Sequence, residues 1–235
     1  MCGRFTLTVE EFEELATLTG AEADRALAEH YRPRYNVAPM QPHWIVREER
    51  ERRLLEPATW GLVNWWAKSR REGAKHINAR AEQLAQRRPF REAFEERRCV
   101  IPADGFFEWT GDAKSRRPTW YHRPDRGVFL FAGLYEVARL RGEDLPTATF
   151  TIITTDSNGP VSEVHDRMPV ILPDEEAVDE WLFPGQSRER LRELLHPVED
   201  DFLVATPVSP RLNSVNNDDP DCLAEAERGS QGALL

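Results

Sequence analysis

The start of the chain, Met1-Cys2-Gly3-Arg4, brings two nucleophiles together on one residue. Removal of the initiator methionine gives Cys2 a free α-amine beside its thiol. Unperturbed, the amine titrates at about pH 8 and the thiol at about pH 8.5, so modest help from a neighbouring acid or base makes either group reactive at neutral pH. With an aldehyde, this aminothiol can form a Schiff base and close to a five-membered thiazolidine ring. From its position alone, Cys2 could equally be a small residue that begins a strand.

Two other side chains are suited to moving protons. Glu108 is a lone carboxylate between aromatic residues, and apolar neighbours would raise its pKa into the range useful for acid–base work. His165 lies where a loop meets a strand, and histidine titrates near physiological pH. Each pattern also fits an ordinary solvent-facing side chain, so these residues are candidates and not yet assignments.

Aromatic and basic residues gather in the middle of the sequence. Segment 64–98 contains ten Lys/Arg and five Glu, although the whole chain has a net charge of −10. Trp65 and Trp66 lie at the start of this segment, and Trp60 precedes it. Trp60 suits a buried core. Trp65 and Trp66 cannot both point inward on a strand, because neighbouring side chains face opposite sides, so we expect one to be exposed. An exposed tryptophan beside arginines is typical of a surface that stacks unpaired bases.

Composition limits the class of protein. Hydrophobic residues make up 40% of the 235 residues and charged residues 31%, which is typical of a soluble globular protein. No apolar run approaches the roughly 20 residues of a spanning helix, and no secretory signal is evident, so we expect no membrane partner and a cytoplasmic location. The three cysteines are too few and too far apart for a disulfide framework or a zinc site, and we expect neither metal nor cofactor.

The hydrophobic pattern predicts more strands than helices. Thr8 and Glu11 suggest a capping box for a first helix that Gly20 ends, and residues 77–82 are expected to lead into a helix interrupted at Pro89. Further helices are expected at 22–29, 90–97, 175–182 and 187–195, and strands at 43–47, 54–60, 99–101, 106–109, 120–122, 128–135, 149–155 and 202–206. Because strands and helices do not alternate, we expect an α+β fold of mainly antiparallel sheets curled into an irregular pseudo-barrel with flanking helices.

Six sequence blocks, taken together, resemble the SOS response-associated peptidase (SRAP) family. They occur in the family's order and span the chain from Cys2 to about Pro220. The blocks are Met-Cys-Gly-Arg-Phe at the start, Arg-Tyr-Asn-Val-Ala-Pro at 34–39, Trp-Gly-Leu at 60–62, Asn-Ala-Arg-Ala-Glu at 78–82, Cys-Val-Ile-Pro-Ala-Asp-Gly-Phe-Phe-Glu-Trp at 99–109 and His-Asp-Arg-Met-Pro at 165–169.

The resemblance implies a protein that recognises abasic sites in single-stranded DNA and joins its N-terminal cysteine to the ring-opened sugar as a thiazolidine, which shields the lesion. By position, Cys2 matches the covalent nucleophile, Asn78 a residue that orients the sugar, and Glu108 with His165 an acid–base pair. The residues that match DNA contacts are Arg4, Trp66, Arg80, Arg88 and Thr154, to which we add Asn36 and Trp65 from the extended loop and the tryptophan pair.

The family also implies one catalytic and DNA-binding domain over residues 1–220, followed by a tail at 221–235. We expect a monomer, of bacterial origin and associated with the nucleoid or replication fork. Two alternatives remain open at this point. The chain could be a thiol peptidase in which Cys2 attacks a peptide bond, in the simplest case the one that holds Met1. It could also be a DNA-binding module without catalysis, in which Cys2 is structural.

Overall fold

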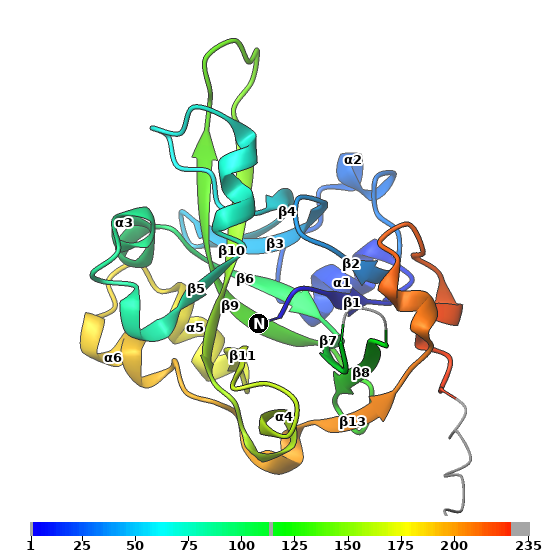
Figure 1. The fold of residues 1–235 in the computed structure, drawn as a ribbon. Helices are drawn as coiled ribbons and strands as arrows, with labels where there is room; N and C mark the ends of the chain where they lie inside the picture. Colours follow the sequence, from blue (N-terminus) through cyan, green and yellow to red (C-terminus); the bar gives the residue numbers. More distant parts are fainter. Residues whose placement is uncertain (1, 113–114, 227–235) are drawn as a thin grey trace, which may run out of the picture.

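Two β-sheets with helices around them make up the protein in a computed structural model, which describes residues 2–112 and 115–226 (Figure 1). The first sheet has five strands in the order β13-β8-β7-β1-β2, and every pairing in it is antiparallel. Its strands are β1 (Phe5–Leu7), β2 (Arg34–Val37), β7 (Gly105–Thr110), β8 (Arg117–His122) and β13 (Val204–Pro207). This sheet contains the chain's first strand and so carries the N-terminal residues.

The second sheet closes on itself. Its path is β11-β10-β4-β3-β6-β9-β12, and β10 also pairs with β9, so that β10, β4, β3, β6 and β9 form a ring. The β10–β4 and β10–β5 pairings are parallel, whereas the others are antiparallel. The strands are β3 (Pro42–Glu49), β4 (Arg52–Trp60), β5 (Asn78–Arg80), β6 (Arg98–Ala103), β9 (Phe129–Ala138), β10 (Thr147–Asp156), β11 (Arg167–Pro169) and β12 (Ile171–Leu172).

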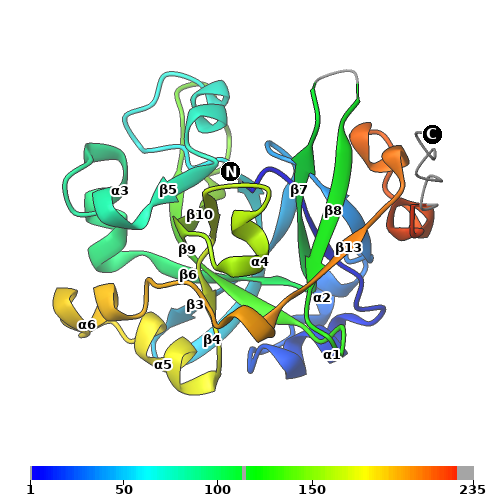
Figure 2. The ribbon, with the colours of Figure 1, turned by 60° about the horizontal axis from the view of Figure 1, so that its bottom comes forward.

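Short helices flank the sheets, with α3, α5 and α6 on one side of the ring (Figures 1 and 2). The α-helices are α1 (Phe12–Leu18), α2 (Arg25–Ala28), α3 (Arg88–Glu96), α4 (Gly159–Ser162), α5 (Glu175–Leu182) and α6 (Arg188–Glu193). The 3₁₀ turns are η1 (Arg70–Lys75), η2 (Ala81–Gln83), η3 (Asp200–Phe202), η4 (Pro210–Asn213) and η5 (Pro220–Leu223). Within the described residues, no helix is long and apolar enough to span a membrane.

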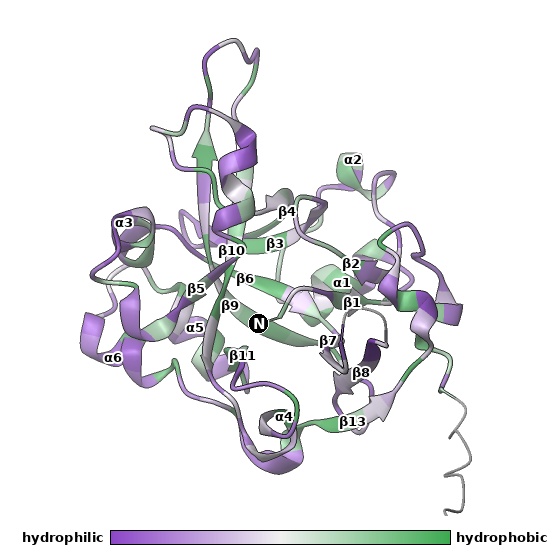
Figure 3. Ribbon diagram, viewed as in Figure 1, coloured by the Kyte–Doolittle hydropathy of each residue, from purple (hydrophilic) through white to green (hydrophobic). Residues whose placement is uncertain are grey.

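The core lies inside the ring and between the ring and the helices. Figure 3 shows hydrophobic residues along β6 and β9 and hydrophilic residues on α6. One buried cluster joins α1, α3 and α5 to the ring and includes Phe94 and Trp181. A second fills the space between the sheets and includes Cys2, Phe5 and Trp60. Cys2 is therefore part of the packed core between the two sheets.

The expected α+β pseudo-barrel is confirmed, but three local predictions are wrong. The first helix begins at Phe12 without a capping box, because the Thr8 hydroxyl and amide both donate to Asp104 Oδ2 at 2.5 Å. Residues 78–80 form β5 and not the approach to a helix, because they pair in parallel with β10. Pro89 does not interrupt a helix but lies in the first turn of α3. Backbone amides in the first turn have no acceptor within the helix, so a proline there costs no hydrogen bond.

Residues 221–226, the start of the expected tail, are packed against the domain. Cys222 is fully buried and packs with Phe107, Trp120 and Leu212. Backbone bonds from Ser209 N to Ala224 O at 2.9 Å and from Ala226 N to Pro207 O at 3.1 Å hold this segment beside β13. The rest of the expected tail, 227–235, lies outside the described residues.

Candidate active site

Cys2 lies at the meeting point of the two sheets. Its side chain is fully buried, and its Sγ is 3.6 Å from Arg4 O. Asn78, the first residue of β5, donates from Nδ2 to Cys2 O at 2.8 Å. Burial raises the pKa of the Cys2 thiol, and the charge of Glu108 raises it further. The thiol is therefore protonated at neutral pH and needs a base before it can attack.

Strand pairing places Glu108 beside the N-terminus. β1 and β7 are antiparallel with Phe5 opposite Phe106, and Phe107 N donates to Arg4 O at 3.0 Å, so the same register places Glu108 opposite Gly3. Glu108 is only 4% exposed. Burial raises its pKa to about 7, and the charge of Asp166 acts in the same direction. A carboxyl with this pKa is half protonated near neutral pH and can both give and accept a proton.

His165 follows α4 and precedes β11, an edge strand of the second sheet. Its Nδ1 lies 2.9 Å from Arg167 N and 3.0 Å from Asp166 Oδ1. A neutral ring accepts from the amide, whereas a protonated ring would donate to the carboxylate. Burial lowers the pKa of His165, which favours the neutral ring bonded to Arg167 N. Protonation therefore exchanges one partner for another and does not leave the ring unanchored.

The short strand β5 presents two of the expected site residues on one face. Side chains alternate along a strand, so Asn78 and Arg80 point one way and the buried Ala79 points into the core. Asn78 bonds Cys2, and Arg80 is exposed. Within residues 2–112 and 115–226, Arg80 pairs with no carboxylate, so its charge is available to an anionic ligand.

The tryptophan pair lies before η1 and contacts α3 through Arg88. Trp65 is 61% exposed, as predicted for one member of the pair, and its ring meets that of Trp66 edge to face at 5.3 Å between centroids. The Arg88 guanidinium lies over the Trp66 ring at 4.7 Å from its centroid. Together Trp65, Trp66 and Arg88 form an aromatic and cationic surface, which we call the tryptophan surface.

The basic segment 64–98 is only partly available to a ligand. Arg70 forms an ion pair with Glu143, and Arg97 forms ion pairs with Glu92 and Glu136. The Arg98 guanidinium is buried, where it donates to carbonyl oxygens that include Trp181 O at 2.7 Å. These three cations are structural. Of the expected DNA contacts in this segment, Arg80 is exposed and Arg88 lies on the Trp66 ring.

Two of the expected DNA contacts are buried. Asn36 is fully buried and donates from Nδ2 to the carbonyl oxygens of Ser214, at 3.0 Å, and Asn217, at 2.7 Å. Its Oδ1 accepts from the Arg4 guanidinium at 2.8 Å. Asn36 therefore fixes Arg4 and the loop after η4. Thr154 is also fully buried, opposite Arg80 in the β10–β5 pairing.

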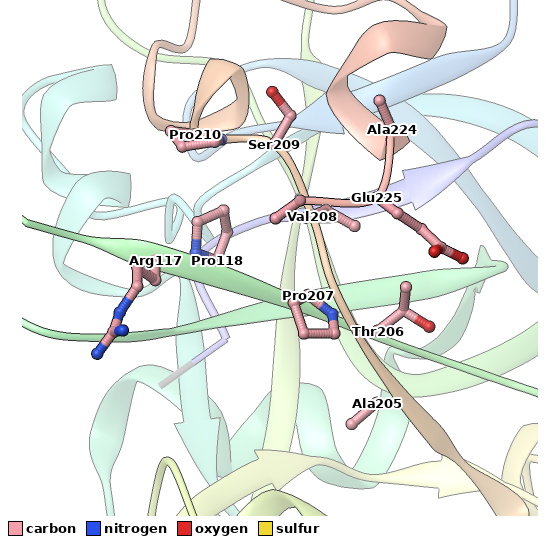
Figure 4. Close-up of a pocket in the computed structure, with 11 residues that line it drawn as sticks. Arg117, Pro118, Ala205, Thr206, Pro207, Val208, Ser209, Pro210, Ala224 and Glu225 are labelled. Carbon is pink, nitrogen blue, oxygen red and sulfur yellow. The ribbon is translucent and has the colours of Figure 1, made fainter. Parts of the chain in front are cut away.

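A cavity of about 350 Å³ opens beside the N-terminus, and Gly3, Arg4 and Glu108 line it. Trp109, Gly111, Arg116 and Asn213 complete its walls. The sequence patterns did not single out Arg116 or Asn213, although the basic run Lys114-Ser115-Arg116-Arg117 is visible in the sequence. A larger cavity, about 830 Å³, lies elsewhere between β8, β13 and residues 224–226 (Figure 4). It contains none of the candidate catalytic residues.

Comparison with known proteins connects this site to a family. The sequence matches the family model described as SOS response associated peptidase (SRAP) over residues 1–215. The abasic site processing protein YoqW of Bacillus subtilis strain 168 is 41% identical over 226 residues, which cover 95% of this chain and 99% of that protein. The abasic site processing protein HMCES of Gallus gallus is 30% identical over 230 residues, which cover 85% of this chain and 68% of that protein.

The fold has a counterpart among solved structures. A crystal structure of a protein from Bacteroides thetaiotaomicron matches 96% of this chain and all of that chain with a TM-score of 0.85 and 25% sequence identity. The overall fold is therefore shared with a solved structure.

Proposed function

Because this chain belongs to the SOS response associated peptidase family, we propose that it processes abasic sites in single-stranded DNA by forming a covalent thiazolidine through Cys2. The names of the relatives support the lesion as the target. The observation that carries the chemistry is the position of Cys2 between Asn78, which bonds its carbonyl oxygen, and Glu108, which lines the cavity beside it. The product shields the lesion.

In the proposed reaction, two nucleophiles, the Cys2 amine and the Cys2 thiol, bond to the aldehyde carbon of the sugar. The closed sugar opens to its aldehyde, and the Cys2 amine, free after removal of Met1, attacks the aldehyde carbon. Loss of one water gives an imine. The thiol then adds to the imine carbon, so that a C–S bond forms, the nitrogen regains a proton and a five-membered ring closes. The balance is one aldehyde and one aminothiol to one thiazolidine and one water, with no oxidant or metal required.

Glu108 is suited to the proton transfers of this sequence. Its pKa of about 7 lets it protonate the departing hydroxyl in one step and take the thiol proton in a later one. Removal of the thiol proton needs such a base because burial raises the pKa of Cys2. Neutral His165 supplies a second proton acceptor. Asn78 fixes the Cys2 carbonyl and so orients the amine and thiol toward one carbon.

The surface beside the site suits a single strand. Trp65 and Trp66 can stack bases that have no pairing partner, and Arg80 and Arg88 supply positive charge for phosphates. A duplex hides its bases from such a surface. The combination therefore favours single-stranded DNA as the proposed substrate.

The free α-amine gives the sharpest test. We compare a protein whose Met1 has been removed with one that carries an N-terminal extension, each incubated with single-stranded DNA that contains one abasic site. In the extended protein the amine lies in a peptide bond, so only a reversible hemithioacetal can form, and we expect binding without an adduct on a denaturing gel. A Cys2→Ser protein with a free N-terminus is the matched control for the thiol.

Equal yields of adduct from the extended and the processed protein would refute the thiazolidine. Mass spectrometry of the same mixtures, run beside a peptide substrate, distinguishes the alternatives. A DNA adduct at Cys2 supports the proposal, cleaved peptide would replace it with a thiol peptidase, and reversible binding alone would replace it with a DNA-binding module.

A further inference from the structure

The cavity beside Glu108 is bounded by two arginines that come from distant parts of the sequence. Arg4 precedes β1, and Arg116 precedes β8 at the end of the β7–β8 hairpin. Arg116 is exposed, whereas Arg4 is half-buried. Within the described residues, neither guanidinium forms an ion pair with a carboxylate. The cavity therefore holds two guanidinium groups that have no ion-pair partner among the described residues, with Glu108 beside them.

The walls of this cavity are fixed by hydrogen bonds. The Arg4 guanidinium donates to Asn36 Oδ1 at 2.8 Å and to Leu212 O at 3.2 Å. Trp109 Nε1 donates to Asn213 Oδ1 at 2.8 Å, and Asn213 Nδ2 donates to Arg116 O at 3.1 Å. Asn213 thus ties the wall formed by Trp109 to the backbone that carries Arg116. The arrangement is preorganised in the absence of a ligand.

The electrostatics of the cavity favour an anion. Burial lowers the pKa of the Arg4 guanidinium, and the charge of Arg116 lowers it further, as two like charges that face a common space must do. Glu108 is the only carboxyl among the described residues that line the cavity, and its pKa is raised to about 7. A phosphodiester between the two guanidinium groups would relieve their repulsion and accept hydrogen bonds from both.

The cavity and the tryptophan surface lie on opposite sides of the N-terminus, which suggests the path of a bound DNA strand. In Figure 1, the N-terminus lies between β5 and α3 on one side and β7 and β8 on the other. Arg80 and Arg88 belong to β5 and α3, whereas Trp109 and Arg116 belong to the β7–β8 hairpin. The tryptophan surface is on the α3 side, because Arg88 of α3 lies on the Trp66 ring. A DNA strand whose bases stack on Trp65 and Trp66 and whose abasic sugar reaches Cys2 would therefore continue past the site toward the β7–β8 hairpin.

We propose that the cavity lined by Arg4, Trp109, Arg116 and Asn213 binds the phosphodiester that adjoins the abasic nucleotide on the side away from the tryptophan surface. Arg4 and Arg116 hold the phosphate oxygens from two directions, and Trp109 forms the wall for the next sugar. The inference rests on the proposed function, since it identifies how the same strand continues beyond the reacting sugar. It assigns to Arg116 and Asn213 a role that no sequence pattern indicated.

Arg116→Gln tests the proposal, and Arg117→Gln is its matched control. Arg117 is the next residue along the chain and carries the same charge, but it lines the separate cavity with Pro118 and Pro207 (Figure 4). The probe is single-stranded DNA with tetrahydrofuran, an abasic analogue that has no aldehyde. Three oligonucleotides carry the analogue in the centre, at the 5′ end or at the 3′ end, and fluorescence anisotropy measures affinity between 50 and 200 mM NaCl.

We expect Arg116→Gln to weaken binding of the central analogue and to make the slope of log affinity against log salt shallower by about 0.7, the value for one phosphate contact on a single strand. The loss of affinity of Arg116→Gln relative to wild type therefore becomes about 2.6-fold smaller when the salt concentration rises fourfold from 50 to 200 mM. One of the two end-placed analogues lacks the phosphate in question and should bind wild type and Arg116→Gln equally. Arg116→Lys should restore the slope, and Arg117→Gln should match wild type on all three.

Equal effects of Arg116→Gln and Arg117→Gln on the central analogue would overturn the proposal, because only net charge would then matter. A loss of the same size on all three oligonucleotides would overturn it as well. The analogue forms no thiazolidine, so these results are independent of the covalent step. A wild-type protein that binds the analogue with the expected pattern but never forms an adduct would refute the proposed function and leave this phosphate site in place.

Discussion

Replacement of Glu108 by glutamine should make the protein more stable at alkaline pH and have a smaller effect in acid. Glu108 is 4% exposed, and burial raises its pKa from an ordinary value of 4.5 to about 7. Between these two values, the folded protein holds a proton that the unfolded chain has released. Stability therefore falls as pH rises through this window, and above it the buried carboxylate carries the full cost of its charge. Glutamine has the same shape and never ionises.

The size of the effect follows from the shift. A difference of about 2.5 pKa units corresponds to about 3 kcal/mol at full ionisation, and about 2 to 3 kcal/mol of this develops between pH 5 and pH 8. We expect the free energy of unfolding of Glu108→Gln, relative to wild type, to rise by that amount between the two pH values. In a chain of this length the corresponding change in melting temperature is about 4 to 10 °C.

Urea unfolding of both proteins at pH 5 and pH 8 measures this difference directly. The comparison of the two pH values in one variant cancels any pH-independent cost of the substitution, such as a changed hydrogen bond. The N-terminus of both proteins must be verified by mass spectrometry, since an adjacent ammonium group would oppose the shift. A stability difference that is the same at both pH values would show that Glu108 titrates normally, and it would remove the physical basis for its acid–base role.

Two other substitutions distinguish a residue that binds DNA from one that stabilises the fold. Trp66→Ala should weaken binding of abasic single-stranded DNA by about 1 to 3 kcal/mol, the contribution of one stacked base, and saturating DNA should restore the yield of adduct; a yield that stays low at saturation would mean that Trp66 positions the sugar. Asn36→Ala should lower the free energy of unfolding by about 1 to 3 kcal/mol in urea, because its carbonyl partners Ser214 O and Asn217 O lose a donor. The same variant should weaken DNA binding through Arg4, whose guanidinium it releases; unchanged stability would refute this structural role.

The sequence alone was sufficient for the family and for the outline of the fold. Six ordered blocks indicated the SRAP family, which the match over residues 1–215 confirms. Runs rich in β-branched and aromatic residues located most strands, because such residues favour extended backbone. Several of these strands, such as β6, are buried along their whole length. The prediction that one of Trp65 and Trp66 is exposed was correct, although the pair lies in a turn and not on the strand from which it was argued.

The sequence could not separate ligand-binding arginines from structural ones. Arg70, Arg80, Arg88 and Arg98 all belong to the same basic segment, yet only the tertiary structure shows that Glu143 neutralises Arg70 and that carbonyl oxygens surround Arg98. The partners of these two cations lie 73 and 83 residues away along the chain. Composition measures the charge of a segment, whereas the availability of that charge depends on what the fold places against it.

The same limit applies to the site itself. Cys2 and Glu108 were recognisable from their chemistry, but the register of β1 with β7 decides that Glu108 lies opposite Gly3, the neighbour of Cys2. The sequence predicts Asn36 to be a DNA contact, whereas its bonds to Arg4 and to a loop about 180 residues away make it a support for Arg4. Local patterns report local conformational preference and burial. Strand order and register arise from the packing of the whole chain, and they alone determine which distant side chains meet.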